Sequence, residues 1–162
     1  MINKRDKDGY TPILNAARYG SARCITTLYT HFGDKIECNV DSCNVELCNA
    51  ENSFNDNAFL LSAMYGHANC IAALHSIYGN KIDCNVVNYS NSNALMLAAS
   101  KGHKSCIKVL YNIFGDKIDY NTVDNSNSNV LLLAASNGHS ECVKILYKIS
   151  GDKINCNAVN FY

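Results

Sequence analysis

The sequence GDKIECN at residues 33–39 recurs as GNKIDCN at 79–85, as GDKIDYN at 115–121 and as GDKINCN at 151–157. The copies begin 46, 36 and 36 residues apart, so the chain holds four units with ten extra residues between the first and the second. Self-similarity at a fixed period of this length indicates a repeat architecture, in which every unit is the same supersecondary element. The content of one unit therefore decides the fold.

Each unit predicts a short first helix. Residues that can accept a backbone N–H at a helix N-terminus occupy one repeat position: Thr11, Asn57, Asn93 and Asn129. The only proline, Pro12, follows the first of them, where its missing N–H costs nothing. We expect the first helix to stop at the next repeated glycine, which is Gly20, Gly66, Gly102 or Gly138 in successive units.

A second helix is predicted by apolar residues at i, i+1, i+4 and i+8. In the first unit these are Cys24, Ile25, Leu28 and Phe32, and in the third they are Cys106, Ile107, Leu110 and Phe114. We expect Gly33 and its equivalents to end this helix with a positive φ, which glycine tolerates.

Two short helices cannot bury enough apolar surface alone, so neighbouring units must stack around a continuous core. The sequence therefore predicts an all-α solenoid, a single domain over 1–162 with units at approximately 3–39, 40–85, 86–121 and 122–157. An unrelated four-helix bundle is the alternative, but it would not require the linkers to repeat as faithfully as the helices.

The residues resemble the ankyrin repeat over nearly the whole chain. DKDGYTPILNAARYG at 6–20 is similar to that family's finger tip, helix start and Ala-Ala-x-x-Gly turn, and GH at 66–67, 102–103 and 138–139 to its Gly-His turn. Three departures are consistent. The 36-residue unit exceeds the family's usual length of about 33, which implies a longer second helix. Leucine or methionine replaces the His of the Thr-Pro-Leu-His helix start, and asparagine replaces the finger-tip glycine after the first unit.

The resemblance implies an ankyrin-type solenoid of helix-turn-helix units with short β-hairpin finger loops, and a binding scaffold without catalysis or cofactor. Its concave surface, formed by the fingers and first helices, would bind a partner protein. Aromatic and other large side chains gather there in the first two units, and these types are enriched at interface cores. The predicted partner-binding residues are Tyr10, Arg18, Tyr19, Phe54, Met64, Tyr65, Tyr89 and Lys101. The alternative for the aromatic residues is packing against neighbouring fingers.

Cysteine and histidine repeat with a spacing that could support chemistry, as His67 and Cys70, His103 and Cys106, and His139 and Cys142. Metal binding and nucleophilic catalysis are possible alternatives. The cysteine position also occurs in the first unit, which has serine instead of histidine, and it precedes a core aliphatic residue. We therefore expect core cysteines and turn histidines, with no metal and no disulfide between equivalent cysteines.

The insertion leaves a second hypothesis open. Cys38, Cys43 and Cys48 form a C-x4-C-x4-C pattern in and beside it, which could hold zinc or act as a redox site. Three thiols without a C-x-x-C pair are a weak signal, and incidental thiols in a lengthened finger are the alternative.

Composition excludes several other classes of function. The 14 basic and 14 acidic residues cancel, so no surplus of cations favours nucleic acid or an anionic membrane as a partner. The nine glycines are assigned to turns, caps and one finger tip, so none forms a phosphate loop. The polar start and short apolar runs favour a cytoplasmic protein whose thiols are reduced. Neither end shows a polar capping repeat, so we expect either an excised array, as in a targeting segment of a larger protein, or weak end-to-end self-association, with a monomer as the alternative to self-association.

Overall fold

The computed structural model describes residues 2–33, 36 and 54–155. Over these residues the chain folds into α-helices, short 3-10 turns and loops, and no strand is present in them. The helices form four pairs, which are α1 (Pro12–Arg18) with α2 (Ala22–Phe32), α3 (Ala58–Met64) with α4 (Ala68–Tyr78), α5 (Ala94–Ser100) with α6 (Lys104–Phe114), and α7 (Val130–Ser136) with α8 (Ser140–Ser150).

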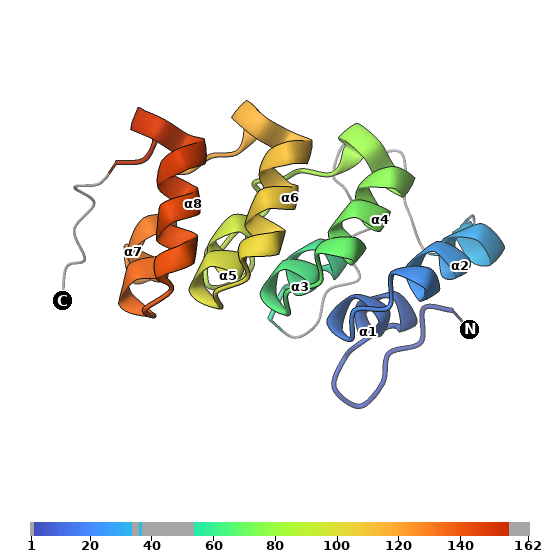
Figure 1. The fold of residues 1–162 in the computed structure, drawn as a ribbon. Coiled ribbons are helices and arrows are strands. Elements are labelled where there is room, and N and C mark those ends of the chain that lie inside the picture. The colour runs from blue at the N-terminus through green and yellow to red at the C-terminus, as the bar shows by residue number, and fades with distance from the viewer. Residues whose placement is uncertain (1, 34–35, 37–53, 156–162) are drawn as a thin grey trace.

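The pairs stack in two rows. Figure 1 shows α1, α3, α5 and α7 side by side in one row, the first row, and α2, α4, α6 and α8 in the other, the second row. Each helix packs on its own partner and on the equivalent helices of the neighbouring pairs. The predicted all-α solenoid is confirmed. The fingers differ from the expected β-hairpins: they are loops closed by two backbone hydrogen bonds, such as those from Asn88 N to Ser92 O at 3.2 Å and from Asn91 N to Asn88 O at 2.9 Å.

The start of each first-row helix follows the sequence signals. Asn57, Asn93 and Asn129 accept a hydrogen bond from the backbone N–H three residues later, at 2.9, 2.9 and 3.0 Å. Thr11 has the same extended backbone but makes no side-chain capping bond, and Pro12 begins its helix. The predicted capping is therefore confirmed in three pairs and wrong in the first.

Left-handed backbone conformations recur where the repeat places glycine or asparagine. At the finger tips, Gly9 has a φ of 85°, and Asn55, Asn91 and Asn127 have values of 63°, 57° and 58°. Asparagine is the next residue after glycine to accept this conformation, which explains the replacement.

The predicted ends of the second-row helices agree with the structure in three pairs and differ in the first. Gly79, Gly115 and Gly151 have the expected positive φ and begin the 3-10 turns Gly79–Lys81, Gly115–Lys117 and Gly151–Lys153. Gly33 instead has a right-handed φ of −45°, because the backbone continues helically and Ile36 N donates to Phe32 O at 2.8 Å. The 3-10 turns account for the extra length expected of the second helix.

The core runs continuously between the two rows. Its fully buried side chains come from every pair and include Leu14, Ile25, Phe59, Ile107 and Leu146. Phe59 meets Phe114 edge to face with ring centroids 5.7 Å apart, so α3 contacts the following pair through aromatic packing. Stability in this chain therefore depends on contacts between pairs as well as within them.

The predicted core positions of the second-row helices hold except in the first pair. Cys70, Cys106 and Cys142 are buried, whereas Cys24 is exposed. The Cys106 thiol approaches Ser62 O of the preceding pair at 3.9 Å, so this repeat position faces the preceding helix pair. Phe114 likewise contacts Phe59 and His75 of the preceding pair. Among the described residues no pair packs on this side of α1 and α2, and Cys24 and Phe32 are exposed, which corrects their assignment to the core.

Histidines at the turns join each pair to the preceding one. The Nε2–H groups of His67, His103 and His139 donate to Arg18 O, Met64 O and Ser100 O at 2.9, 3.0 and 3.1 Å. The predicted turn role of these histidines is confirmed. The ring also lies against the glycine of the preceding turn: a β-carbon added at Gly20, Gly66 or Gly102 would lie 2.5 to 2.7 Å from the histidine Nδ1. Glycine is therefore required at these three turns.

The asparagine that closes each repeated linker motif makes a second connection between pairs. Asn85 Nδ2 donates to Lys117 O at 2.8 Å, and its Oδ1 accepts from Asp119 N at 2.8 Å. One unit later, Asn121 Nδ2 donates to Lys153 O at 2.7 Å and Asn155 N donates to Asn121 Oδ1 at 2.8 Å. Each side-chain amide thus satisfies one acceptor and one donor of the next linker, which explains why asparagine repeats there.

Replacing Asn121 with alanine should lower the free energy of unfolding by about 1–2 kcal/mol, because two hydrogen bonds between pairs are lost at a partly solvated site. Urea unfolding followed by circular dichroism measures this change. Asn112→Ala is the matched control, since Asn112 is exposed on α6 and alanine favours a helix. Equal stability of the two variants would show that the amide bridge contributes nothing.

In the part of the chain that the structure describes, no helix combines the length and apolar character needed to cross a bilayer.

Candidate functional site

Arg18, at the end of α1, is surrounded by tyrosine rings. Its guanidinium carbon lies 4.7 Å from the ring centroid of Tyr10, 5.5 Å from that of Tyr19 and 5.8 Å from that of Tyr65. The Tyr65 side chain also hydrogen-bonds to Arg18. Tyr65 occupies in the second pair the position that Tyr19 occupies in the first, so repetition of one exposed position builds the cluster from two pairs. Cation–π contacts within about 6 Å are attractive.

Side chains of this cluster differ in their exposure. Tyr19 is 72% exposed and Tyr65 40% exposed, whereas Tyr10 is only 9% exposed. The buried ring of Tyr10 therefore contacts Arg18 from the protein side, whereas Tyr19 and Tyr65 present ring surface to solvent. Phe54 is 66% exposed and shares a hollow with Tyr10 and Arg18. We name these five residues, Tyr10, Arg18, Tyr19, Phe54 and Tyr65, the Arg18 patch.

The other three predicted partner-binding residues lie outside the patch. Met64 is half-buried and packs against the core. Tyr89 is 71% exposed on the next finger, whose backbone N–H donates to Phe54 O at 3.2 Å. Lys101 is exposed at the end of α5, one pair beyond Tyr65. The structure thus extends an exposed surface from the patch to Tyr89 and Lys101 and directs Met64 inwards.

Aspartate and asparagine hold the fingers in shape. Asp6 Oδ1 accepts from Asp8 N and Tyr10 N at 3.0 and 2.9 Å, and its Oδ2 accepts from Asn15 Nδ2 at 2.9 Å. The Asn15 bond, followed by the Tyr10 bond, lowers the pKa of Asp6. Asn88 and Asp124 occupy the equivalent position and accept equivalent backbone bonds. These anchors were not predicted, although the recurrence of an acid or amide at one repeat position was a usable signal.

His103 is the turn histidine whose titration the structure perturbs. Burial lowers its pKa below 6.5, the hydrogen bond to the Met64 carbonyl favours the protonated form, and electrostatic repulsion from His67, His139 and Lys101 opposes it. Unfolded histidine has a pKa of about 6.5. The neutral form is therefore favoured by folding, and its stabilisation is complete above about pH 6.5 and is lost as the pH falls towards the folded-state pKa.

We expect the free energy of unfolding to fall between about pH 7 and pH 5, and to fall less in His103→Gln, which cannot titrate. Urea titrations at the two pH values measure the difference. His31→Gln is the control, because His31 lies exposed at the end of α2. If His103→Gln retained the full loss of stability on acidification, His103 would not be the responsible group.

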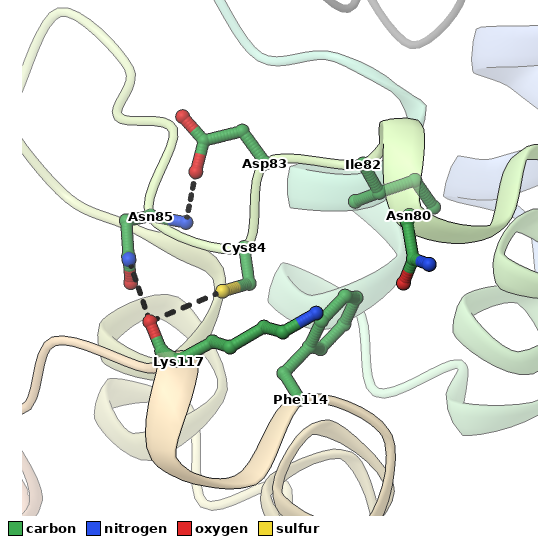
Figure 2. Close-up of a pocket in the computed structure, with 7 residues that line it drawn as sticks. All are labelled: Asn80, Ile82, Asp83, Cys84, Asn85, Phe114 and Lys117. Atoms are coloured by element: carbon green, nitrogen blue, oxygen red, sulfur yellow. Dashed lines mark hydrogen bonds between the residues drawn. The ribbon is translucent and has the colours of Figure 1, made fainter.

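A second hollow lies in the linker beyond α4 and offers no reactive group. It has a volume of about 170 Å³ and contains the thiol of Cys84, which donates to Lys117 O at 3.6 Å (Figure 2). Burial, and then the nearby Asp83 carboxylate, raises the pKa of Cys84. The thiolate is the reactive form of cysteine, so this thiol is a poor nucleophile. Cys84 and its equivalent Tyr120 are both buried, which supports a packing role.

The buried cysteines of the second-row helices are also poor nucleophiles. Burial raises the pKa of Cys70 to about 11 and that of Cys106 to about 12. Within residues 2–33, 36 and 54–155, no cluster of three or more His, Cys, Asp or Glu side chains is placed to hold a metal ion. The five cysteines in these ranges are free thiols. The C-x4-C-x4-C pattern of Cys38, Cys43 and Cys48 lies outside the described residues.

Comparison with known proteins agrees with this architecture. A family model described as ankyrin repeats (3 copies) matches residues 37–124 and 59–160, which together make up most of the chain. The first helix pair precedes both matches, but it packs on the second pair as the later pairs pack on one another. No curated protein matches the chain. The chain therefore belongs to the ankyrin repeat family, whose repeats are generally protein–protein interaction modules and whose members are typically not enzymes.

Proposed function

We propose that this protein is a scaffold that binds a partner protein through the fingers and first-row helices of its first two helix pairs, and that it has no catalysis of its own. The observation that carries the proposal is the Arg18 patch, in which a guanidinium and exposed aromatic rings from two pairs lie together. Tyrosine and arginine are the residue types that most often dominate binding energy at protein interfaces.

The distribution of exposed residues supports the position of this surface. At the repeat position of Tyr19 and Tyr65, the third and fourth pairs carry Lys101 and Asn137. At the finger position of Phe54, the third and fourth pairs carry Ser90 and Ser126. Aromatic surface thus decreases along the stack, and the later pairs extend and stabilise it.

The absence of catalysis is proposed on the chemistry of the described side chains. Burial raises the pKa of the thiols Cys70, Cys84, Cys106 and Cys142, which disfavours the nucleophilic thiolate. The turn histidines bond to backbone carbonyls and contact glycines. Free thiols also suit a reducing compartment, so we propose a cytoplasmic location.

Affinity selection from a displayed random peptide library tests the proposed function. The wild-type chain should enrich peptides that fail to bind the double variant Tyr19→Ala/Tyr65→Ala but still bind Tyr147→Ala. Tyr147 is 74% exposed on α8, in the other row of helices. Peptides that bind all three proteins equally well would place recognition away from the Arg18 patch and refute the proposal.

A further inference from the structure

The guanidinium of Arg18 lies among three tyrosine rings and makes one side-chain hydrogen bond, to Tyr65, so other N–H groups remain for a ligand. Arginine is planar, and its five N–H donors point outwards in the plane of the guanidinium, where they match the two oxygens of a carboxylate. The ring centroids of Tyr10, Tyr19 and Tyr65 lie within 5.8 Å of the guanidinium carbon. These contacts restrain the side chain, so binding a ligand requires less loss of side-chain freedom than binding to a mobile arginine.

Arg18 has no carboxylate partner within 4.0 Å among the described residues, whose ion pairs are Lys144 with Glu141 and Lys153 with Asp116. The Arg18 residue is nevertheless half-buried, and its guanidinium is partly desolvated. A cation that is partly removed from water gains more from a carboxylate than a fully solvated one. The patch therefore presents a partly desolvated cation that is bonded to Tyr65 and has no carboxylate within 4.0 Å among the described residues.

A hollow of about 650 Å³ opens beside this guanidinium, which is enough for side chains of a docked segment. It is bounded by both charge and apolar surface. Lys7 supplies a second cation, and Phe54 and Tyr10 supply ring surface. Asp8 also lines the hollow and supplies one negative charge. The residues lining the hollow are Lys7, Asp8, Gly9, Tyr10, Arg18 and Phe54.

Charge is unevenly distributed along a chain that is neutral overall. Residues 2–21, which precede α2, contain Lys4, Arg5, Lys7 and Arg18 but only two carboxylates, Asp6 and Asp8. Asp6 is bound within its own finger by Asn15 and two backbone N–H groups, and it also interacts electrostatically with Arg18. Lys101 adds a further exposed cation to the first-row surface. The surface around Arg18 is thus cationic and complements an acidic segment.

We propose that the partner is recognised through an acidic side chain, aspartate or glutamate, which Arg18 binds through the edge of its guanidinium with Lys7 nearby. An apolar neighbour in the same peptide segment packs on Phe54 and Tyr19. This inference rests on the proposed function, which it deepens by specifying the chemistry of the partner segment.

The test uses peptides selected from the random library by the wild-type chain. They should be enriched in aspartate or glutamate next to an apolar residue. Arg18→Gln should weaken their binding about 10- to 100-fold, the loss expected for hydrogen bonds to a charged group. Arg23→Gln is the matched control, because it removes the same charge from an exposed position on α2 and should leave the affinity unchanged.

A second measurement leaves the protein intact. Replacing the acidic residue of a selected peptide with glutamine should weaken binding to the wild-type chain by a similar factor, and should have little further effect on Arg18→Gln. Selected peptides without acidic enrichment that still depend on Tyr19 and Tyr65 would overturn the acidic partner and leave the proposed function intact. Peptides that bind only when a phosphoserine replaces the acidic residue would also overturn it. A library that yields no peptide dependent on Tyr19 and Tyr65 would refute both proposals.

Discussion

Gly66→Ala is expected to destabilise the protein by about 2–5 kcal/mol, although it adds only one methyl group. Part of the cost, about 1–2 kcal/mol, is the left-handed backbone, since Gly66 has a φ of 81°. The rest comes from His103. The new β-carbon would lie 2.7 Å from Nδ1 and 2.8 Å from Cε1 of its ring, so the ring must move and release Met64 O.

Gly138→Ala provides a matched control for this prediction. Gly138 has a similar φ of 74°, but among the described residues no heavy atom beyond its chain neighbours lies within 4 Å of its added β-carbon. This variant should show only the backbone cost, and Gly66→Ala should exceed it by about 1–3 kcal/mol, the value of a lost hydrogen bond to a buried group. Urea unfolding measures both. Equal destabilisation would show that the contact between glycine and histidine does not hold the pairs together.

The double variant Tyr19→Ala/Tyr65→Ala is expected to lose about 2–4 kcal/mol of binding free energy, which is about 30- to 1000-fold in affinity, for peptides selected by the wild-type chain. Both rings are exposed, and both contact the Arg18 guanidinium. Their loss removes ring surface from the interface and also frees the guanidinium to move. Isothermal titration calorimetry measures the affinity.

Stability separates this effect from unfolding. Exposed side chains contribute little to folding, so the double variant should lose no more than about 1 kcal/mol of stability. Tyr147→Ala removes a comparably exposed ring from α8 and should bind as the wild type does. An unchanged affinity in the double variant, or an equal loss in Tyr147→Ala, would show that the Arg18 patch is not the binding surface.

The internal repeat explains why so much of the fold was predictable. One repeat position corresponds to one structural position, so each capping asparagine, turn glycine and finger-tip asparagine was supported by several copies. The direction of side chains along the stack was less predictable. Cys24 and Phe32 match the pattern of Cys106 and Phe114 but are exposed, because their repeat position faces the preceding pair and the described residues place no pair there. A repeat pattern contains no information about which unit lacks a neighbour.

Contacts between units were also beyond prediction. The bonds of Asn85 and Asn121 to the next linker require the spacing of stacked pairs, which sequence does not provide. The same holds for the candidate site. The sequence identified Tyr10, Arg18, Tyr19 and Tyr65 individually, but only the structure shows that Arg18 lies over the three rings and that Tyr10 is buried beneath it.

Nuclear magnetic resonance titration of a selected peptide into the isotope-labelled wild-type chain tests the binding surface most directly. We predict shifts of the amide resonances in the first two fingers and at the ends of α1 and α3, around Tyr19, Phe54 and Tyr65. Resonances of α6 and α8 should remain in place. Shifts concentrated on the second-row helices, with the resonances of the Arg18 patch unmoved, would contradict it.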